Sequence, residues 1–279
     1  MTIKQFSSRI QFFTWSHSFA SKLTLAFVGV LFLSSCASTL NGSKYTFEPS
    51  PTPYENVLAA QSKATKTNKL LLVVLGASWC HDSTALAKQF GTPEMQLILE
   101  AHYETIFVDV GLLEDRRQIT QHFSYPIYYA TPTVMVVEPE SSALLNRVTM
   151  DKWGHAASIP HSDYVEYFSS FPVLTSQQKS LILNWHPSSE EVTYNDQHAE
   201  RLQQAYNTLA PQLAKDIQGK TPEGFYDLWK EVKVFRSELQ KSLTKRAEHA
   251  LDEIENGRNE ALSTPAYRHY HPFSWESKS

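Results

Sequence analysis

Residues 70–83 read LLLVVLGASWCHDS and contain a hydrophobic run, a small turn and the beginning of a helical pattern. The first six residues are all apolar, which is typical of a strand buried on both faces of a sheet. Trp79 and Cys80 follow the turn, and apolar residues then recur at helical spacing. Cys80 is therefore predicted to lie where unpaired backbone N–H groups and the helix dipole favour negative charge. This position favours the thiolate, which is the nucleophilic form of cysteine.

The composition of the chain is that of a globular protein. The chain has 279 residues, of which 42% are hydrophobic and 19% charged, so it is long enough for one domain and a smaller unit. The formal net charge of -4 gives no indication of a broad basic surface, and no nucleic-acid partner is predicted. The two cysteines, Cys36 and Cys80, have very different surroundings, so a structural disulfide between them is not expected.

The amino-terminal segment has the pattern of an export signal. Residues 1–35 carry three basic residues and no acid, and residues 23–33 form an apolar run too short to span a bilayer comfortably. The run ends in Leu33-Ser34-Ser35-Cys36, which resembles the bacterial lipobox. The resemblance implies a signal peptide over 1–35 and a lipidated Cys36 as the first mature residue. Ala37 after the cysteine does not resemble an inner-membrane retention signal, so the resemblance implies an anchor in the outer membrane. An uncleaved anchor is the alternative.

The next part of the chain alternates between strand and helix patterns. Residues 36–53, with three prolines, predict a flexible tether. Strands are predicted over 70–75, 106–110, 134–137 and 144–150, and helices over 54–66, 83–90, 114–123, 162–168 and from Thr92-Pro93-Glu94 with Thr92 as the cap. This alternation through residue 137 predicts a parallel α/β core with one strand appended afterwards.

The carboxy-terminal part shows only helical patterns. Apolar residues recur at steps of three and four over 197–217, where Pro211 is predicted to kink or split the helix. Thr221-Pro222-Glu223 is predicted to start another helix, which also has an apolar face. From residue 258 onward the chain, including His269 and His271, is predicted to be a loosely packed tail. The apolar faces indicate core packing, and a partner-binding helix pair is the alternative.

Two motifs resemble the thioredoxin-like superfamily. They are Trp79-Cys80-His81-Asp82-Ser83 after a buried strand and Thr131-Pro132-Thr133 before another strand, and the strand ending in Asp109 also matches. The resemblance implies an α/β thioredoxin-like fold with a C-terminal all-helical extension, in which 54–172 is the thioredoxin-like domain, 173–258 the helical region and 259–279 the tail. It also implies a cis Pro132 that faces Cys80 and, with Trp79 and the backbone of Thr131, binds an incoming peptide.

The sequence departs from this superfamily at two positions. The second, resolving cysteine of the family falls on Ser83, and its buried acid falls on Val74. A single thiol can form a mixed disulfide, but its release then requires another thiol. A protonated His81 is predicted to stabilise the thiolate, and Ser83 is predicted to donate a hydrogen bond to it. The negative charge of Asp82 opposes the thiolate. The alternatives are an inert Cys80 and a solvated His81.

Other motifs for metal or cofactor binding are weak. His155, His161 and Asp163 have a spacing that matches no tight ligand motif, so no metal site is predicted. An iron–sulfur cluster shared between subunits does not fit the exported address. The sequence contains neither a Walker-type glycine loop nor a lipase-type serine elbow, and no cofactor is predicted.

Two functional hypotheses follow. The first is a lipid-anchored, periplasm-facing lipoprotein that performs monothiol thiol–disulfide exchange through Cys80 with envelope proteins carrying disulfides or thiols. The second is a non-catalytic interaction module, in which the surface around Trp79 and Pro132 forms a peptide groove and the helical region docks a partner.

Overall fold

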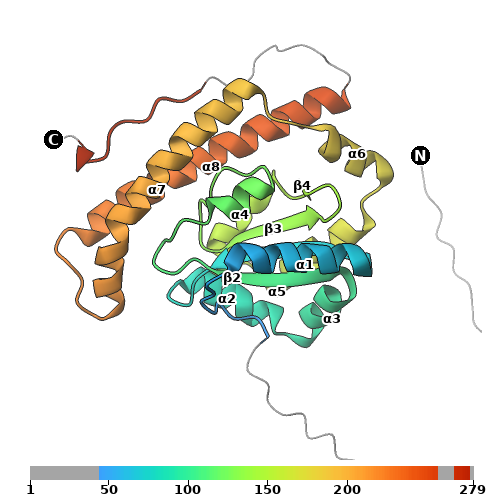
Figure 1. The fold of residues 1–279 in the computed structure, drawn as a ribbon, viewed down its shortest axis with the longest axis horizontal. Helices are drawn as coiled ribbons and strands as arrows, with labels where there is room; N and C mark the ends of the chain where they lie inside the picture. Colours follow the sequence, from blue (N-terminus) through green and yellow to red (C-terminus); the bar gives the residue numbers. More distant parts are fainter. Residues whose placement is uncertain (1–43, 257–266, 277–279) are drawn as a thin grey trace, which may run out of the picture. The chain divides into compact units, whose positions relative to one another are not determined.

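A four-stranded mixed sheet forms the centre of the protein in a computed structural model that describes residues 44–256 and 267–276 (Figure 1). The strands are β1 (Leu70–Gly76), β2 (Tyr103–Asp109), β3 (Thr133–Glu138) and β4 (Ala143–Leu144), in the order β2-β1-β3-β4. The helices of the domain are α1 (Pro53–Thr67), α2 (His81–Phe90), α3 (Pro93–His102), α4 (Arg117–His122), η1 (Met150–Ser158), α5 (His161–Ser170) and η2 (Phe171–Val173).

The third strand runs opposite to the direction that the alternating pattern predicted. β1 pairs with β2 in parallel but with β3 antiparallel, so the prediction of a parallel core is wrong for β3. The connection before β3 contains the six-residue helix α4, which is about 9 Å long. Thr133 at the start of β3 pairs with Leu75 near the end of β1. β3 therefore begins at the edge where β1 ends.

Helices cover both faces of the sheet. Every residue of β1 is buried, in agreement with the apolar run that predicted a strand covered on both sides. The first core combines one face of the sheet with apolar residues of α1, α4 and the carboxy-terminal helices. The second combines the other face with α2, α3 and α5. The α/β fold class with a helical extension is thereby confirmed.

The segment before α1 is packed rather than flexible. Tyr45 and Phe47 are buried, and their rings contact Phe90 at 5.8 Å and Phe107 at 4.9 Å between centroids. Gly76 leaves room for Phe47, because a Cβ at this glycine would lie 2.6 Å from that ring. The prediction of a flexible tether over 36–53 is thus wrong from residue 44 onward. Cys36 and the preceding signal segment lie outside the described residues.

The fourth strand is shorter than the sequence predicted. Residues 144–150 were expected to form a strand, but β4 ends at Leu144. The amide of Asn146 then takes the place of further strand pairing. Its Nδ2 donates to the Val134 carbonyl at 2.9 Å, and its Oδ1 accepts from the Val136 N–H at 2.9 Å. A polar side chain thus satisfies backbone groups of β3 that a longer β4 would have bound.

One predicted capping bond and one predicted helix start need correction. Thr92 lies at the N-cap of α3, but its Oγ1 donates to the Gln89 carbonyl at 2.7 Å instead of capping α3. The last helix begins at Phe225 rather than at residue 221, after Gly224 with φ of 76°. Thr221 instead donates through its hydroxyl to Asp216 at 2.6 Å. Both threonines therefore stabilise the end of the preceding segment.

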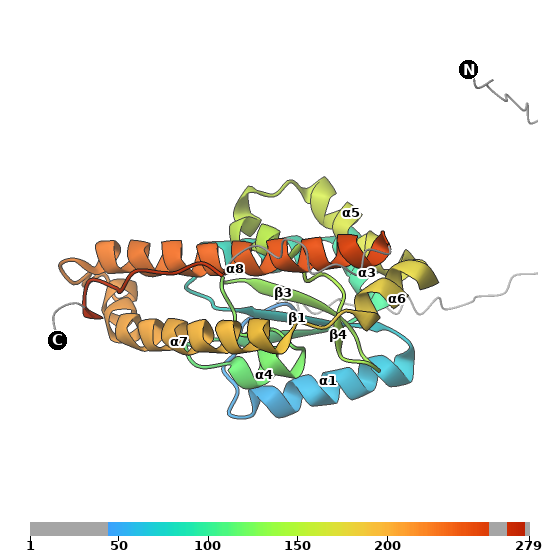
Figure 2. The same ribbon diagram turned by 90° about the horizontal axis from the view of Figure 1, so that it is seen from above.

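The helical region consists of α6 (Ser176–Asn184), α7 (Ser189–Ile217) and α8 (Phe225–Glu255). α7 and α8 lie side by side in both views (Figures 1 and 2). Pro211 lies on the exposed side of α7, which continues through it, so the predicted split does not occur. None of the described helices is long and apolar enough to span a membrane.

The described end of the tail is packed against these helices. Tyr270 and Phe273 are buried, and each ring lies about 5 Å from Phe235 of α8. The prediction of a loose tail is therefore wrong for residues 267–276. His269 and His271, on either side of the buried Tyr270, are exposed.

Candidate functional site

Cys80 lies at the junction between β1, the central strand, and α2. It occupies the N-cap position of α2 with extended backbone angles, and its side chain is partly exposed. Its N–H donates to the Ala77 carbonyl at 3.1 Å, and its carbonyl accepts from the Thr84 N–H at 3.0 Å. These bonds fix the turn, so the sulfur is held at the N-terminus of α2, where the helix dipole favours negative charge.

The partner of the sulfur is Thr131. The Thr131–Pro132 peptide bond is cis, and Pro132 is buried beside Cys80. Cys80 Sγ donates to the Thr131 carbonyl at 3.0 Å, and Thr131 Oγ1 donates back to Sγ at 3.2 Å. The predicted cis proline loop facing Cys80 is confirmed. After loss of the thiol proton, the hydroxyl can still donate to the thiolate, whereas the carbonyl loses its donor.

Ser83 does not bind the sulfur. It is fully buried, and its Oγ accepts a hydrogen bond from the Ala77 N–H at 3.4 Å. In the described part of the chain, no hydrogen bond joins Ser83 to Cys80, so the predicted donation from Ser83 to the thiolate is wrong. The serine hydroxyl instead satisfies the turn that precedes Cys80, and Thr131 takes the role of donor.

The two residues after Cys80 have different surroundings. His81 is exposed, and among the described residues none forms a hydrogen bond with its ring. Asp82 Oδ1 accepts from the Ala157 N–H at 2.9 Å and so connects α2 to the end of η1. Asp82 thus has a structural contact that the sequence did not predict. The exposed position of His81 agrees with the alternative in which this histidine is a solvated loop residue.

A tryptophan of the helical region borders the site. Trp79 Nε1 donates to the Gly111 carbonyl at 2.7 Å, and its ring meets the edge of Trp229 from α8 at 6.2 Å. The guanidinium of Arg236 lies 5.6 Å from the Trp229 ring. Sequence reasoning missed Trp229, although its place one turn after Phe225 on an apolar helix face was a signal. The appended helices therefore form one side of the surface around Trp79.

The central strand lacks the buried acid that the resemblance to thioredoxin-like proteins implies. Val74 takes that position and is fully buried. Asp109 pairs with Gly76 on the neighbouring strand, and burial raises the pKa of its carboxyl, opposed in part by the Gly111 N–H and Arg116. The strand leading to Cys80 itself thus supplies no proton acceptor.

Two of the three residues considered for metal binding, His161 and Asp163, have other contacts. His161 Nδ1 lies 2.8 Å from Gln89 Oε1, and its Nε2 lies 3.2 Å from a Glu94 oxygen. Asp163 pairs with Lys152 at 3.6 Å. Within residues 44–256 and 267–276, no group of three or more His, Cys, Asp or Glu side chains is placed to hold a metal ion.

A cysteine at the N-cap position of a helix, opposite a cis proline and beside a mixed sheet between two helical layers, defines a thioredoxin-type domain with one cysteine at its site. Residues 52–139 match the sequence model of a family described as Thioredoxin-like, and this part of the chain is a thioredoxin-like domain.

One similar solved structure is the disulphide isomerase from Xylella fastidiosa Temecula1. The two chains are 23% identical with a TM-score of 0.41, and the match covers 47% of this chain and 97% of the isomerase chain. No curated protein matches the sequence significantly.

Proposed function

We propose that the protein is a membrane-tethered lipoprotein whose thioredoxin-like domain performs monothiol thiol–disulfide exchange with envelope proteins. The observation that carries the proposal is the partly exposed Cys80 sulfur, 3.2 Å from the donating hydroxyl of Thr131 at the N-terminus of α2. The hydroxyl of Thr131 and the N-terminus of α2 are thus placed next to the atom that attacks a disulfide.

The reaction consists of two balanced exchanges. The Cys80 thiolate attacks one sulfur of a client disulfide, so that a Cys80–client disulfide forms and the other client sulfur leaves as a thiolate. A second thiolate then attacks the client sulfur and releases Cys80 as a thiolate. If that second thiolate belongs to the same client, the outcome is isomerisation with no net oxidation or reduction. Ser83 cannot perform this second step, so the mixed disulfide persists until another thiol arrives.

The long-lived intermediate predicts that the native protein traps its clients without mutation. Non-reducing electrophoresis of envelope extracts, after acid quenching and alkylation, is expected to show covalent adducts that a reductant dissolves. The Cys80→Ser variant is the matched control, because it keeps the size of the side chain and removes the nucleophile. Adducts of equal yield in this variant, or their absence from the native protein, would contradict the exchange reaction.

The tether is proposed from the lipobox-like sequence before Cys36, which lies outside the described residues. Mass spectrometry of the mature N-terminus is expected to find Cys36 as the first residue, carrying lipid. Loss of residues 1–35 changes the formal net charge from -4 to -7, because three basic residues and no acids are removed. An unmodified Cys36, or a chain still beginning at Met1, would rule out the lipoprotein part of the proposal.

Trp229 is expected to affect exchange with peptides but not with small reagents. Its ring packs on Trp79, so Trp229→Ala removes one side of the surface beside Cys80. The rate of mixed-disulfide formation with a disulfide-bonded peptide is expected to fall at least about fivefold, as for truncation of an aromatic interface residue. The rate with a small thiol reagent should change by less than about twofold, since such a reagent does not contact the surface that Trp229 forms. Tyr226→Ala, at an exposed aromatic residue of the same helix, is the control.

A second candidate is the non-catalytic interaction module. It is favoured by the contact in which the Cys80 thiol donates to the Thr131 carbonyl, because only a thiol that keeps its proton makes this bond. The rate of Cys80 alkylation across pH distinguishes the two. A large thiolate fraction near neutrality supports exchange, and the reactivity of an ordinary or inaccessible thiol supports the module.

A further inference from the structure

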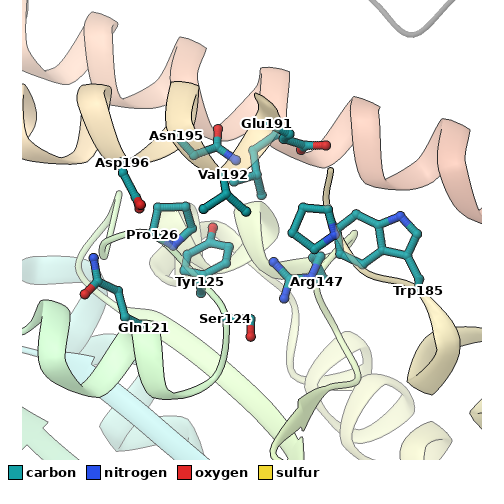
Figure 3. Close-up of a pocket in the computed structure, with 12 residues that line it drawn as sticks. Gln121, Ser124, Tyr125, Pro126, Arg147, Trp185, Glu191, Val192, Asn195 and Asp196 are labelled. Atoms are coloured by element: carbon teal, nitrogen blue, oxygen red, sulfur yellow. The ribbon is translucent and has the colours of Figure 1, made fainter. Parts of the chain in front are cut away.

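A pocket of about 360 Å³ lies away from the cysteine, between the thioredoxin-like domain and the start of α7 (Figure 3). Pockets for small molecules commonly fall between about 300 and 1,000 Å³. Neither Cys80 nor the Thr131–Pro132 loop lines it. The lining comes from the end of α4, the segment 124–126, Arg147, the α6–α7 connection, the first turns of α7 and one residue of α8. The pocket is therefore separate from the proposed exchange site.

The pocket is lined by a buried arginine that forms no ion pair with any described residue. Arg147 is 9% exposed, and among the described residues its single hydrogen bond is a long one, from Nη2 to the Phe123 carbonyl at 3.5 Å. Burial lowers the pKa of its guanidinium, opposed in part by Tyr125 and by the carboxylate of Glu191, which lies beyond ion-pair distance. A buried charge is costly unless an opposite charge or several hydrogen bonds compensate for it. Arg147 thus offers unused N–H donors to the pocket.

Aromatic rings hold the guanidinium in place. Its carbon lies 4.9 Å from the Trp185 ring and 5.9 Å from the Tyr125 ring. A neighbouring cavity of about 320 Å³ is also lined by Arg147 and Trp185, so the guanidinium lies between two open spaces. A guanidinium fixed against aromatic faces presents its fork of N–H groups in one plane, which matches the two oxygens of a carboxylate.

The charges of the lining favour a carboxylate with a donor group over a phosphate. The lining contains one cation, Arg147, and two acids, Glu191 and Asp196. Glu191 lies 3.6 Å from Arg246, whereas Asp196 is exposed and has no hydrogen-bond or ion-pair partner among the described residues. A phosphate carries about two negative charges near neutral pH and would face these acids with one cation to balance it. The one cation of the described lining, Arg147, suits a single carboxylate, and the two acids suit a ligand that also carries a positive group.

We propose that this pocket binds a small amino-acid-like molecule, with its carboxylate on Arg147 and its ammonium group facing Asp196. Figure 3 shows these two residues on opposite sides of the pocket, with Tyr125 and Val192 between them. The apolar surfaces of Tyr125, Val192 and Pro126 suit the side chain of such a ligand. The proposal does not depend on the reactivity of Cys80.

The test is calorimetric titration of the full chain in detergent with the common L-amino acids and a matched set of analogues. For the best amino acid we expect a Kd at or below about 1 mM. For L-phenylalanine the analogues are L-phenylalaninamide, which lacks the carboxylate, and 3-phenylpropionate, which lacks the ammonium group. The amide is expected to bind at least about tenfold more weakly, which corresponds to about 1.4 kcal/mol. Inorganic phosphate is expected to give no saturable binding.

Two variants test the two ends of the pocket. Arg147→Gln is expected to weaken amino-acid binding at least about tenfold. Asp196→Asn, at an exposed position where folding is not at risk, is expected to weaken the amino acid but not 3-phenylpropionate. Failure of every L-amino acid to saturate below about 10 mM, equal affinity of acid and amide, or unchanged binding in both variants would each overturn the proposal. Saturable binding of phosphate that Arg147→Gln abolishes would also overturn the proposal and would indicate a site for inorganic anions instead.

Discussion

Replacing Ser83 with cysteine is expected to change the protein from one that accumulates mixed disulfides to one that releases them. Cys80 is the N-cap of α2 and Ser83 is the third residue of that helix. Side chains at these two positions lie close enough to contact each other across the first turn. A thiol at residue 83 is therefore placed to attack the Cys80–client disulfide within the same molecule, at a high effective concentration.

The measurement is the yield of trapped adducts on non-reducing gels, in a Cys36→Ser background so that no other cysteine takes part. Ser83→Cys is expected to lower the yield at least about tenfold and to form an internal disulfide on oxidation. Thr84→Cys is the control, because it adds the same group at the next, exposed residue of α2. If both variants trapped clients as well as the parent protein, the missing second thiol would not explain the trapping.

Truncation of Tyr206 is expected to destabilise the whole described unit. This residue of α7 is fully buried, its ring stacks on Tyr128 at 5.2 Å, and its hydroxyl donates to the Tyr128 carbonyl at 3.0 Å. Tyr206→Ala removes a large aromatic side chain from the core, so the free energy of unfolding is expected to fall by about 3–5 kcal/mol. Urea denaturation followed by circular dichroism measures this change.

Tyr206→Phe is the matched control for this variant. It keeps the ring and leaves the Tyr128 carbonyl without its donor, so the expected loss is about 1–3 kcal/mol. A single transition that moves as a whole in both variants would show that the helical region and the thioredoxin-like domain unfold together. A loss below about 1 kcal/mol for Tyr206→Ala would mean that α7 contributes little to the stability of the domain.

The contacts around Cys80 show how far local sequence patterns reach. The run at residues 70–75 and the helical spacing after Cys80 placed the thiol at a strand–helix junction, and the structure has it there. The hydrogen-bond partner of the sulfur was assigned to Ser83, three residues away, but is Thr131, fifty-one residues away. Sequence proximity favoured the wrong donor, because the orientation of each hydroxyl depends on the surrounding packing.

The carboxy-terminal part shows the same limit. Helical periodicity predicted apolar faces correctly, since the spacing of apolar residues depends only on helix geometry. It did not show that Trp229 would meet Trp79, or that Arg147 would be enclosed between Trp185 and Tyr125. Nor did it show that Tyr45 and Phe47 would pack beside Gly76, where prolines and polar residues had indicated a tether.

The sequence by itself determined the three main strands, most of the helices and the junction that carries Cys80, because each depends on neighbouring residues and their periodicity. The proline loop before the third strand came from the resemblance to the thioredoxin-like superfamily. Tertiary structure alone decided the direction of β3, the donor to the Cys80 sulfur, the tryptophan beside Trp79 and the pocket around Arg147. Each of these is a contact or pairing between segments far apart in the chain, and the packing of layers on the sheet sets it.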